Sequence, residues 1–297
     1  MATSLPALAP TAYRYSVGEV TVTAIPDGTR SMPLTDGFVR NAPRAAVNAA
    51  LKAAFLPEDQ LTLYFNPLLL EIAGRRILVD TGFGPQPGPS SIGQLQPTLA
   101  AIGVAADTID TVVISHFHLD HINGLLGPDG TAAFPNASVL VPEHEWGFWT
   151  DADNASRAPE GQKAAFANVA RVFDAVSERV FRYNWDQEIA PGLTTIGTPG
   201  HTPGHTSFML ESGKDRLFIQ SDLTNTPFLF ARNPGWHAAF DMDPDLAEAS
   251  RRRMLAQVAA ERILLAGFHY PFPGAAHLEA DGEGYRFVPV PWVQAGA

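Results

Sequence analysis

The stretch His116-Phe117-His118-Leu119-Asp120-His121 places four metal-binding side chains within six positions. It directly follows Thr111-Val112-Val113-Ile114-Ser115, whose β-branched residues predict a buried strand. A strand fixes the point from which these ligands start, and the turn after the strand directs them toward a common centre. Hydrophobic cores and solvated faces are not usually composed in this way, so we interpret the stretch as a metal site.

Three further residues of ligand type follow predicted strands later in the chain. The full set of seven is His116, His118, Asp120, His121, His201, Asp222 and His269, a number that suits a two-metal site. The chain has no cysteine, which excludes disulfides and thiolate ligands. Imidazole and carboxylate ligands suit Zn²⁺, and also Mn²⁺, Co²⁺ or Fe²⁺, so we expect two divalent ions with zinc as the first choice.

The composition limits the classes of partner. The 297 residues are 45% hydrophobic, which is ordinary for a globular protein, and no apolar run reaches the roughly 18–20 residues of a membrane span. A net charge of −11 argues against nucleic acid and anionic membranes, and favours a small-molecule substrate. Residues 1–12 lack the basic start and apolar stretch of a signal peptide, which favours a cytoplasmic location, although a processed periplasmic chain would look the same.

The predicted elements indicate an α/β fold. Strands are expected in both halves of the chain with helices between them, which fits two mixed sheets packed face to face under outer helices. Specific expectations are a strand and turn over 13–28, a helix over about 90–101, a hairpin around Ser212-Gly213 and a helix that Asp243-Pro244 begins. We expect residues 13–297 to form a single domain and residues 1–12 to form a tail. The apolar tail and the 288–292 segment are compatible with a homodimer.

The motif His-x-His-x-Asp-His, with Asp80-Thr81-Gly82 before it and Thr198-Pro199-Gly200-His201 after it, resembles the metallo-β-lactamase superfamily. Within that superfamily the chain looks most like methyl parathion hydrolase and its lactonase relatives. The residues that carry this narrower likeness are 20–28, 134–137, 272–274 and 284–290. The resemblance implies the four-layer αβ/βα sandwich of a metal-dependent hydrolase.

The resemblance also implies how the ligands are shared. His116, His118 and His201 would bind one metal, Asp120, His121 and His269 the other, and Asp222 would bridge them. Acyl-homoserine lactonases carry a tyrosine three residues after the bridging aspartate, where this chain has Asn225.

Other residues are candidates for supporting roles. Asp80 is expected either to hold a ligand histidine in its tautomer or merely to organise a turn, and His205 to support the site rather than bind metal. The expected substrate-binding residues are Trp149, Phe166, Asn225 and Phe228, and Asp120 and Asp222 are the expected catalytic carboxylates. In contrast, Arg251-Arg252-Arg253 is most simply a solvated helix face, and His144, His237 and His277 are expected to have surface or packing roles.

These residues favour a binuclear hydrolase that cleaves a small, mostly apolar ester or lactone, with aryl phosphotriesters as a side activity. Two cations lower the pKa of the water between them, which gives a hydroxide nucleophile near neutral pH. The alternatives are a methyl parathion-type organophosphate hydrolase, an acyl-homoserine lactonase, and an iron-dependent oxidoreductase of the same fold. A non-enzymatic metal scaffold ranks last, because all seven ligands are present.

Overall fold

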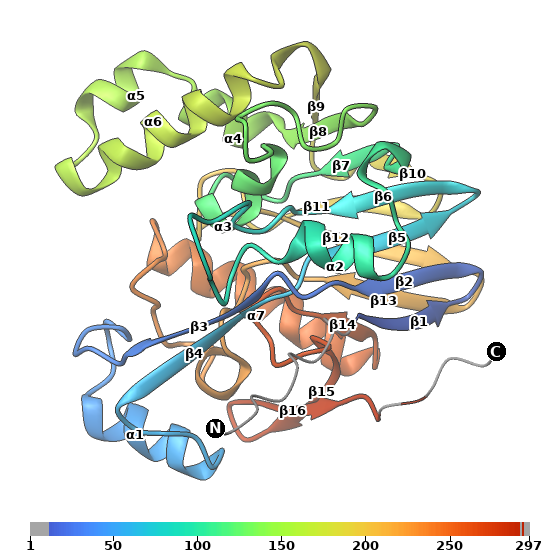
Figure 1. The fold of residues 1–297 in the computed structure, drawn as a ribbon. Helices are drawn as coiled ribbons and strands as arrows, with labels where there is room; N and C mark the ends of the chain where they lie inside the picture. The colour runs from blue at the N-terminus through green and yellow to red at the C-terminus, as the bar shows by residue number, and fades with distance from the viewer. Residues whose placement is uncertain (1–11, 292, 294–297) are drawn as a thin grey trace, which may run out of the picture.

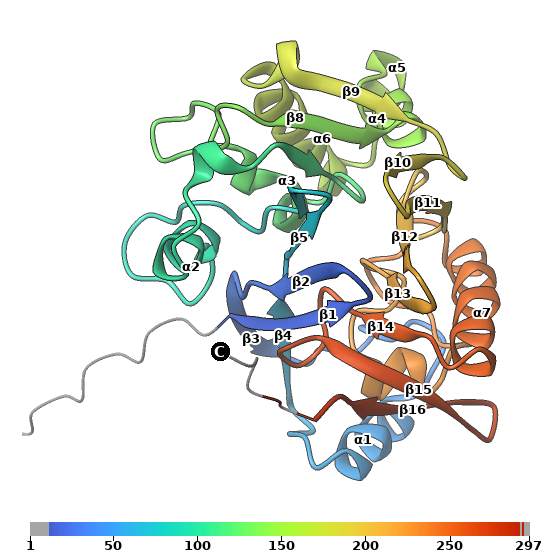
Figure 2. The same ribbon diagram turned by 90° about the vertical axis from the view of Figure 1, so that its right-hand side faces the viewer.

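Two seven-stranded sheets lie face to face at the centre of the protein (Figures 1 and 2). The computed structural model describes residues 12–291 and 293, so the expected N-terminal tail and Trp292 lie outside the described residues, apart from Ala12. The expected homodimer was based partly on this tail and partly on residues 288–292, of which all but Trp292 are described.

The first sheet has the order β1-β2-β5-β6-β7-β8-β9. Its strands are β1 (Tyr13–Val17), β2 (Val20–Ala24), β5 (Leu68–Ile72), β6 (Arg75–Val79), β7 (Thr111–Val113), β8 (Ser138–Pro142) and β9 (Val180–Tyr183). The strands from β1 to β6 pair antiparallel, and those from β6 to β9 pair parallel. The ligand strand β7 is therefore central, with a parallel neighbour on each side.

The second sheet has the order β10-β11-β12-β13-β14-β15-β16. Its strands are β10 (Glu188–Ala190), β11 (Leu193–Gly197), β12 (Thr206–Ser212), β13 (Asp215–Ile219), β14 (Leu264–Ala266), β15 (Ala275–Asp281) and β16 (Gly284–Pro289). Only β13 and β14 pair parallel among these neighbours. The hairpin predicted around Ser212-Gly213 is β12–β13.

Helices lie outside the two sheets, and one of them (residues 44–53) packs in a separate hydrophobic cluster. They are α1 (Arg44–Ala53), α2 (Leu95–Ala101), α3 (Leu119–Ile122), α4 (Glu143–Trp149), α5 (Ala152–Arg157), α6 (Glu160–Asp174) and α7 (Pro244–Ala260). Short helical turns occupy Ala106–Thr108, Asn123–Leu125, Ser177–Arg179 and Pro227–Ala231. Figure 2 shows α7 outside the second sheet and α2 outside the first.

The side chains of the strands alternate between two cores, which explains the four layers. In β13, Leu217 and Ile219 face the core between the sheets, whereas Phe218 packs under α7 with Met254 and Leu255. The first sheet does the same in β6, where Ile77 and Val79 face inward and Leu78 packs toward the outer helices. Period-two alternation with both faces buried requires apolar residues throughout, as these sequences have. The predicted αβ/βα sandwich is confirmed.

A two-stranded ribbon stands apart from the two sheets. Strands β3 (Gly28–Pro33) and β4 (Gln60–Phe65) pair antiparallel and run toward α1, as Figure 1 shows. Leu61, Leu63 and Phe65 lie on one face of β4 and belong to a separate hydrophobic cluster with α1. This ribbon contributes one wall of the cavity described below.

Two expected elements have different boundaries. Residues 13–25 form the β1–β2 hairpin and not one strand, because Gly18 adopts a φ of +55° that allows the chain to reverse. The helix expected from about residue 90 begins at Leu95, whose backbone N–H is bound by the Asp27 side chain at 2.9 Å. The 82–94 segment is instead a loop, and the Asp27 carboxylate holds it by accepting backbone N–H groups from both of its ends.

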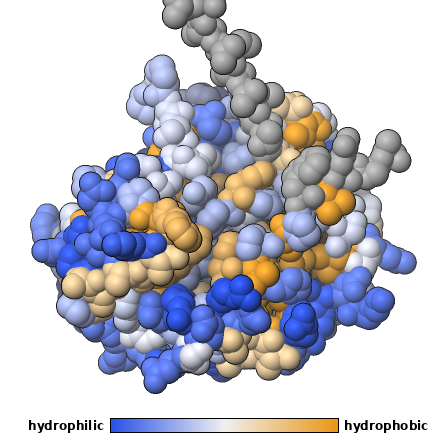
Figure 3. Space-filling view, turned by 90° about the horizontal axis from the view of Figure 1, so that it is seen from below, coloured by the Kyte–Doolittle hydropathy of each residue, from blue (hydrophilic) through white to orange (hydrophobic). Residues whose placement is uncertain are grey.

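In the view from below, Figure 3 shows hydrophobic patches separated by hydrophilic side chains. Among the described residues, Phe55 is the most exposed large hydrophobic side chain, at 97%. Within the same residues, no helix combines the length and the apolar character needed to cross a membrane.

Candidate metal centre

The seven ligand-type residues meet where strands of both sheets end. His116 follows β7 by three positions, Asp222 follows β13 and His269 follows β14, while His201 lies in the β11–β12 loop. The remaining three ligands leave the strand through α3, since His118 directly precedes this short helix and Asp120 lies in its first turn. The two sheets thus bring together residues that are about 150 positions apart in the sequence.

Three overlapping groups of these side chains have their ligand atoms within 4.8 Å of one another. The groups are His116, His118 and His201; His116, His121 and Asp222; and Asp120, His121 and His269. In the first group, His118 Nδ1 lies 3.1 Å from His116 Nε2 and 2.9 Å from His201 Nε2. Zn–N bonds of about 2.0–2.1 Å place two ligands of a tetrahedral ion about 3.3 Å apart, so the spacing suits one ion.

The Asp222 carboxylate lies between the groups. Its Oδ2 atom is 3.3 Å from His201 Nε2 and 3.0 Å from His269 Nε2, and its Oδ1 atom is 3.2 Å from His121 Nε2. Asp120 lies on the second side only, with Oδ2 3.4 Å from His269 Nε2. One carboxylate therefore faces both clusters of imidazoles.

Each of four histidines has its outer nitrogen committed to an oxygen acceptor. His121 Nδ1 lies 2.8 Å from Asp80 Oδ2, and His201 Nδ1 lies 3.0 Å from Asp241 Oδ1. His269 Nδ1 lies 2.8 Å from the Tyr64 carbonyl, and His116 Nδ1 lies 3.0 Å from Ser115 Oγ, whose proton goes to Asp80. An N–H that donates outward leaves the inner nitrogen with a lone pair, which is the form that binds metal.

The histidine nitrogens that face the centre of the site consequently carry no proton to donate. His121 Nε2 and Asp222 Oδ1 face each other at 3.2 Å, are fully buried, and have no hydrogen-bond partner. Two buried acceptors in contact repel each other unless a cation lies between them. The donor set and these orphaned atoms therefore fit a pair of divalent metal ions.

The pKa values of the ligand residues also indicate that the buried carboxylates of the site favour a positive charge beside them. Burial lowers the pKa of His116 and of His118 well below the ordinary value. Burial also lowers the pKa of His201, but hydrogen bonds to Asp222 and Asp241 outweigh it and raise the value to about 9. Burial raises the pKa of Asp222, yet His269 and His121 outweigh burial and hold it well below the usual range. In the metal-free protein, the carboxylates therefore favour protonation of His201, at a nitrogen that would bind a metal ion in the loaded protein.

Asp80 and His205 lie directly behind the ligands. Asp80 accepts hydrogen bonds from the backbone N–H and the hydroxyl of Ser115, both at 2.8 Å, in addition to its contact with His121. His205 Nε2 accepts the backbone N–H of Asp222 at 3.0 Å, and its Nδ1 donates to the Thr198 carbonyl at 3.0 Å. Both nitrogens of His205 are used, so it supports the Asp222 backbone and has no lone pair left for a metal.

Arg251 corrects the expectation of a solvated arginine face on α7. Arg252 and Arg253 are exposed, but Arg251 is only 1% exposed and its Nη2 lies 3.1 Å from Asp241 Oδ2. The physical reason is its register, because Ala247, Met254, Leu255 and Val258 form the buried stripe of the helix and position 251 falls within it. That spacing was the available signal for Arg251, whereas its partner Asp241 lies before the helix and had no such signal.

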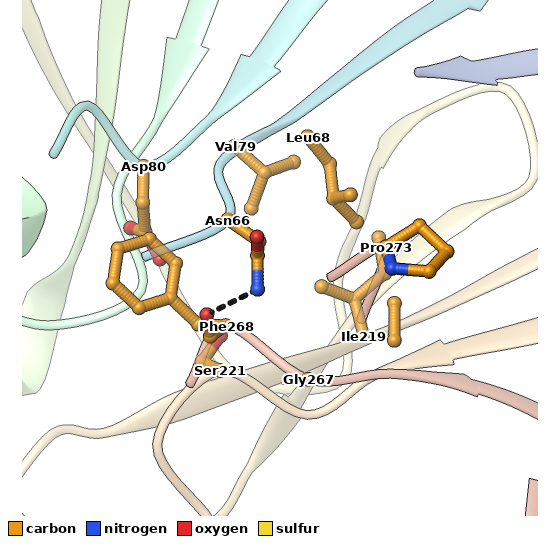
Figure 4. A pocket seen from close by; sticks show the side chains of 10 residues that line it. Asn66, Leu68, Val79, Asp80, Ile219, Ser221, Gly267, Phe268 and Pro273 are labelled. Carbon is orange, nitrogen blue, oxygen red and sulfur yellow. Dashed lines mark hydrogen bonds between the residues drawn. The ribbon is translucent and has the colours of Figure 1, made fainter. Parts of the chain in front are cut away.

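Asn66 is a second residue that the sequence did not single out. Its Nδ2 donates to the carbonyls of Phe268 at 3.0 Å and Tyr270 at 2.7 Å, the residues on either side of His269. Figure 4 shows this side chain pointing at the Phe268 carbonyl, with Asp80 and Ser221 lining the same small cavity of about 10 Å³. A single amide thus fixes the backbone that presents a ligand histidine.

A cavity of about 590 Å³ opens beside the ligands. Its wall includes His118, Asp120, His201, Asp222 and His269 at one end. The rest is mostly apolar, with Met32 and Leu63 from the ribbon, Phe65, Phe83, Phe117 and Phe240 as aromatic residues, and Ala164 and Ala165 from α6. Polar groups are few, namely Arg30, Asn123, Asn168 and Asn225.

Only one of the four expected substrate-binding residues lies on this wall. Asn225 does, with Nδ2 donating to Asp222 Oδ2 at 3.3 Å. Trp149 and Phe166 instead pack together in the outer core of the first sheet, with ring centroids 4.7 Å apart, and Trp149 donates to the buried Glu145. Phe228 lines a separate cavity of about 70 Å³ on another side of His269. The cavity wall is formed by segments that are far apart in the sequence. Nearness to a ligand in the sequence therefore does not by itself identify the residues that line the cavity.

Comparison with known proteins gives matches over most of the chain. Residues 66–267 match the family model of the metallo-beta-lactamase superfamily. The chain is 27% identical over 239 residues to an N-acyl homoserine lactonase of Bacillus thuringiensis, covering 73% of this chain and 86% of that protein.

Two solved structures are similar over nearly the whole chain. A complex of AidC, described as a dizinc quorum-quenching lactonase, with a product has a TM-score of 0.90 and 25% identity, covering 96% of this chain and 99% of that one. The hydrolase AbOPH of the beta lactamase superfamily has a TM-score of 0.88 and 28% identity, covering 97% of this chain and 99% of that one.

Proposed function

The chain belongs to the metallo-β-lactamase superfamily, and from this premise we propose that it is a dizinc hydrolase that opens the ring of an acylated lactone. The observation that carries the proposal is the position of two groups of metal ligands at one end of a largely apolar cavity. The similarity to N-acyl homoserine lactonases and to AidC supports zinc as the metal and a lactone as the substrate.

The ligand geometry supports a division into two metal positions. His116, His118 and His201 would hold one ion, and Asp120, His121 and His269 would hold the other. Asp222 would be shared, because its two oxygens face histidines of both groups. Two zinc ions bound here would activate a water near neutral pH and polarise the carbonyl group of the ester bond.

The protein's own groups would orient the substrate and handle the proton. Asp120 lines the cavity beside the ligands, so its carboxylate lies where it can take a proton from the attacking water and pass that proton to the departing alkoxide. Asn225 donates one N–H to Asp222 and keeps its second N–H and its carbonyl oxygen for the substrate. An amide side chain cannot deliver a proton, so the transfer falls to Asp120.

The cavity wall favours a neutral substrate with an apolar chain. Each methylene buried from water contributes about 0.8 kcal/mol, and a cavity of about 590 Å³ has room for a lactone ring and a medium acyl chain. Acyl-homoserine lactones have this form, with one polar head and one hydrophobic tail.

The test is kinetics of the zinc-loaded protein on acyl-homoserine lactones, aromatic lactones, aryl esters and aryl phosphotriesters. We expect kcat/KM to be highest for an acyl-homoserine lactone by at least about 100-fold, or roughly 3 kcal/mol in transition-state stabilisation. Equal or higher activity on another class would reject the lactone assignment. Iron in the purified protein together with oxygen consumption would instead support the oxidoreductase alternative.

Aryl phosphotriesters are the second candidate substrates, in line with the narrower likeness to methyl parathion hydrolase. Four aromatic side chains line the cavity, and two of them, Phe65 and Phe83, meet edge to face with centroids 4.7 Å apart. Aromatic walls of this kind accept an aryl leaving group. We propose this as a side activity, measured in the same substrate panel.

A homodimer remains a prediction. The exposed Phe55 adopts a φ of +58°, an uncommon conformation for a residue other than glycine, and sits at the end of α1. Light scattering of Phe55→Ser against the unmodified chain tests whether this position contributes to association.

A further inference from the structure

Arg251 lies behind the metal centre and makes four hydrogen bonds to groups on two different segments. Its Nε donates to the Leu223 carbonyl at 3.0 Å and its Nη2 to Asp241 Oδ2 at 3.1 Å. Its Nη1 donates to the carbonyls of Pro234 at 3.1 Å and Trp236 at 2.6 Å. A guanidinium that is 1% exposed has to be paired in this way, because an isolated buried charge is strongly unfavourable.

The first connection runs through Asp241 to His201. Asp241 divides its carboxylate, with Oδ2 on Arg251 and Oδ1 on His201 Nδ1 at 3.0 Å. The backbone reinforces this contact, since Met242 N donates to the His201 carbonyl at 3.1 Å and Asp243 N donates to the Gly200 carbonyl at 2.9 Å. The arginine therefore fixes the carboxylate that sets the tautomer and the orientation of a ligand histidine.

The second connection runs through the backbone to Asp222. Leu223 directly follows this aspartate, so Arg251 holds the carbonyl of the peptide group that lies one residue beyond Asp222. The intervening peptide group is held as well, since Leu223 N donates to the Gln220 carbonyl at 3.1 Å. On the other side, the Asp222 N–H is bound by His205. The backbone around Asp222 is thus held at its N–H by His205 and, one peptide group beyond the residue, at the Leu223 carbonyl by Arg251.

The helix that carries Arg251 is well anchored to the His201 loop. Asp243 caps α7 by accepting the Leu246 N–H at 3.0 Å, and Ser250 Oγ donates to the Pro199 carbonyl at 2.7 Å. The contact is so close that a Cβ atom on Gly200 would lie 2.1 Å from Ala247 N. These contacts hold α7 against the His201 loop. Arg251 therefore has a fixed position from which it bonds both Asp241 and the Leu223 carbonyl.

We propose that Arg251 is a positioning residue of the metal centre, which holds His201 and Asp222 at the separation that a shared pair of ions requires. It acts through Asp241 and the Leu223 carbonyl and lies outside the cavity wall, so it does not touch the substrate. The proposal rests on the metal-binding part of the proposed function and is independent of which substrate is hydrolysed.

The experiment compares Arg251→Met with Arg252→Met, which makes the same change of charge one position along the same helix. Arg252 is exposed and pairs with Glu248. Zinc is titrated into each metal-free protein in competition with a chromogenic zinc chelator. We expect Arg251→Met to weaken at least one of the two zinc equivalents by about 10–100-fold, as loss of an outer-layer partner does, and Arg252→Met to match the unmodified chain.

Kinetics give a second readout. Arg251→Met should lower kcat on hexanoyl-homoserine lactone at saturating zinc while KM stays within about twofold, because the cavity wall is unchanged. A variant that is less stable to heat but keeps native zinc affinity and native kcat would overturn the proposal, since that result describes a purely structural arginine.

Asp241→Asn provides the test if Arg251→Met does not fold. It keeps the size of the side chain and removes the charge that His201 and Arg251 share, so zinc affinity should fall in the same range. Where Arg251→Met folds, the losses in the double variant should be smaller than the sum of the single losses, because both changes break one path. Native zinc affinity in Asp241→Asn, or fully additive losses, would contradict the path through Asp241. Tight zinc binding without lactonase activity would reject the proposed substrate and leave this comparison intact.

Discussion

Four of the seven residues of the metal centre lie between His116 and His121, whereas the wall of the cavity beside it comes from segments as distant as Arg30 and Phe240. In the centre, the inner nitrogens and carboxylate oxygens are buried and face one another, and the outer nitrogens are bound to fixed acceptors. On the wall, most contacts are apolar and only a few amides and one guanidinium are polar.

This difference between the metal centre and the cavity wall indicates that the two parts of the site have different roles. We expect the centre to tolerate almost no change, because its buried polar atoms are either hydrogen-bonded or, like His121 Nε2 and Asp222 Oδ1, placed where a metal ion would satisfy them. The wall is held by packing, and packing accepts hydrophobic replacements of similar volume at small cost. The centre therefore decides which bond is broken, and the wall decides which substrate is accepted.

The largest expected effect comes from removing the shared carboxylate. Asp222→Ala leaves His121, His201 and His269 without the anion that faces them, so the two proposed ions would lose their common ligand. We expect kcat/KM to fall by at least about 1,000-fold, equivalent to about 4 kcal/mol, with less than two zinc ions retained per chain. Metal analysis and kinetics check this result. Asp245→Ala is the control, because its side chain is 96% exposed.

A smaller effect is expected one layer behind the ligands. Asp80→Asn keeps the shape of the side chain but weakens the acceptor of the His121 Nδ1 proton. An asparagine can also present its N–H₂ to that nitrogen and so stabilise the wrong tautomer. We expect zinc affinity to fall by about 10–100-fold, measured by competition with a chelator. Unchanged affinity would show that Asp80 serves only the turn at Ser115.

The same contrast explains what could be predicted from the sequence. The layered fold and the group of ligands were predictable, because alternating apolar strands and a dense ligand motif are local signals. The wall was not predictable, because Trp149 and Phe166 follow the same apolar spacing whether they face a cavity or a core, and here they face a core. Arg251 was misjudged for a related reason, since three consecutive arginines suggest solvent until the buried register of α7 is considered.

The wall predicts a graded dependence on chain length. Each methylene added to the acyl chain should raise kcat/KM by up to about fourfold, which corresponds to about 0.8 kcal/mol, until the cavity is full. Ala165→Phe, on the face of α6 that lines the cavity, should make the rise stop at shorter chains and leave short substrates unaffected. The measurement is kcat/KM across a series from butanoyl- to dodecanoyl-homoserine lactone. A uniform loss for all chain lengths would place the effect on the metal centre and not on the wall.

An effect on stability, and not on catalysis, is expected at Asp27, whose side chain holds the loop that brings Phe83 to the wall. Its carboxylate accepts the backbone N–H groups of Phe83 and Leu95, both at 2.9 Å, and of Gly93 at 3.2 Å. Burial, the largest influence, raises the pKa of Asp27 to about 6, and these three hydrogen bonds offset it only in part.

Since the folded pKa of Asp27 lies above the ordinary 3.8, the protonated carboxyl group favours the folded state. This contribution is fully present below about pH 4 and is lost as the pH rises through about 6, a difference of at most about 3 kcal/mol. Asp27→Asn loses an acceptor at every pH but has no titration in this window. The free energy of unfolding of the unmodified chain, minus that of Asp27→Asn, should therefore fall between pH 4 and pH 7, measured by urea denaturation of the metal-free proteins. A flat difference would contradict this expectation, because it would mean that the three hydrogen bonds offset burial in full and that the carboxylate is as well stabilised in the folded loop as in water.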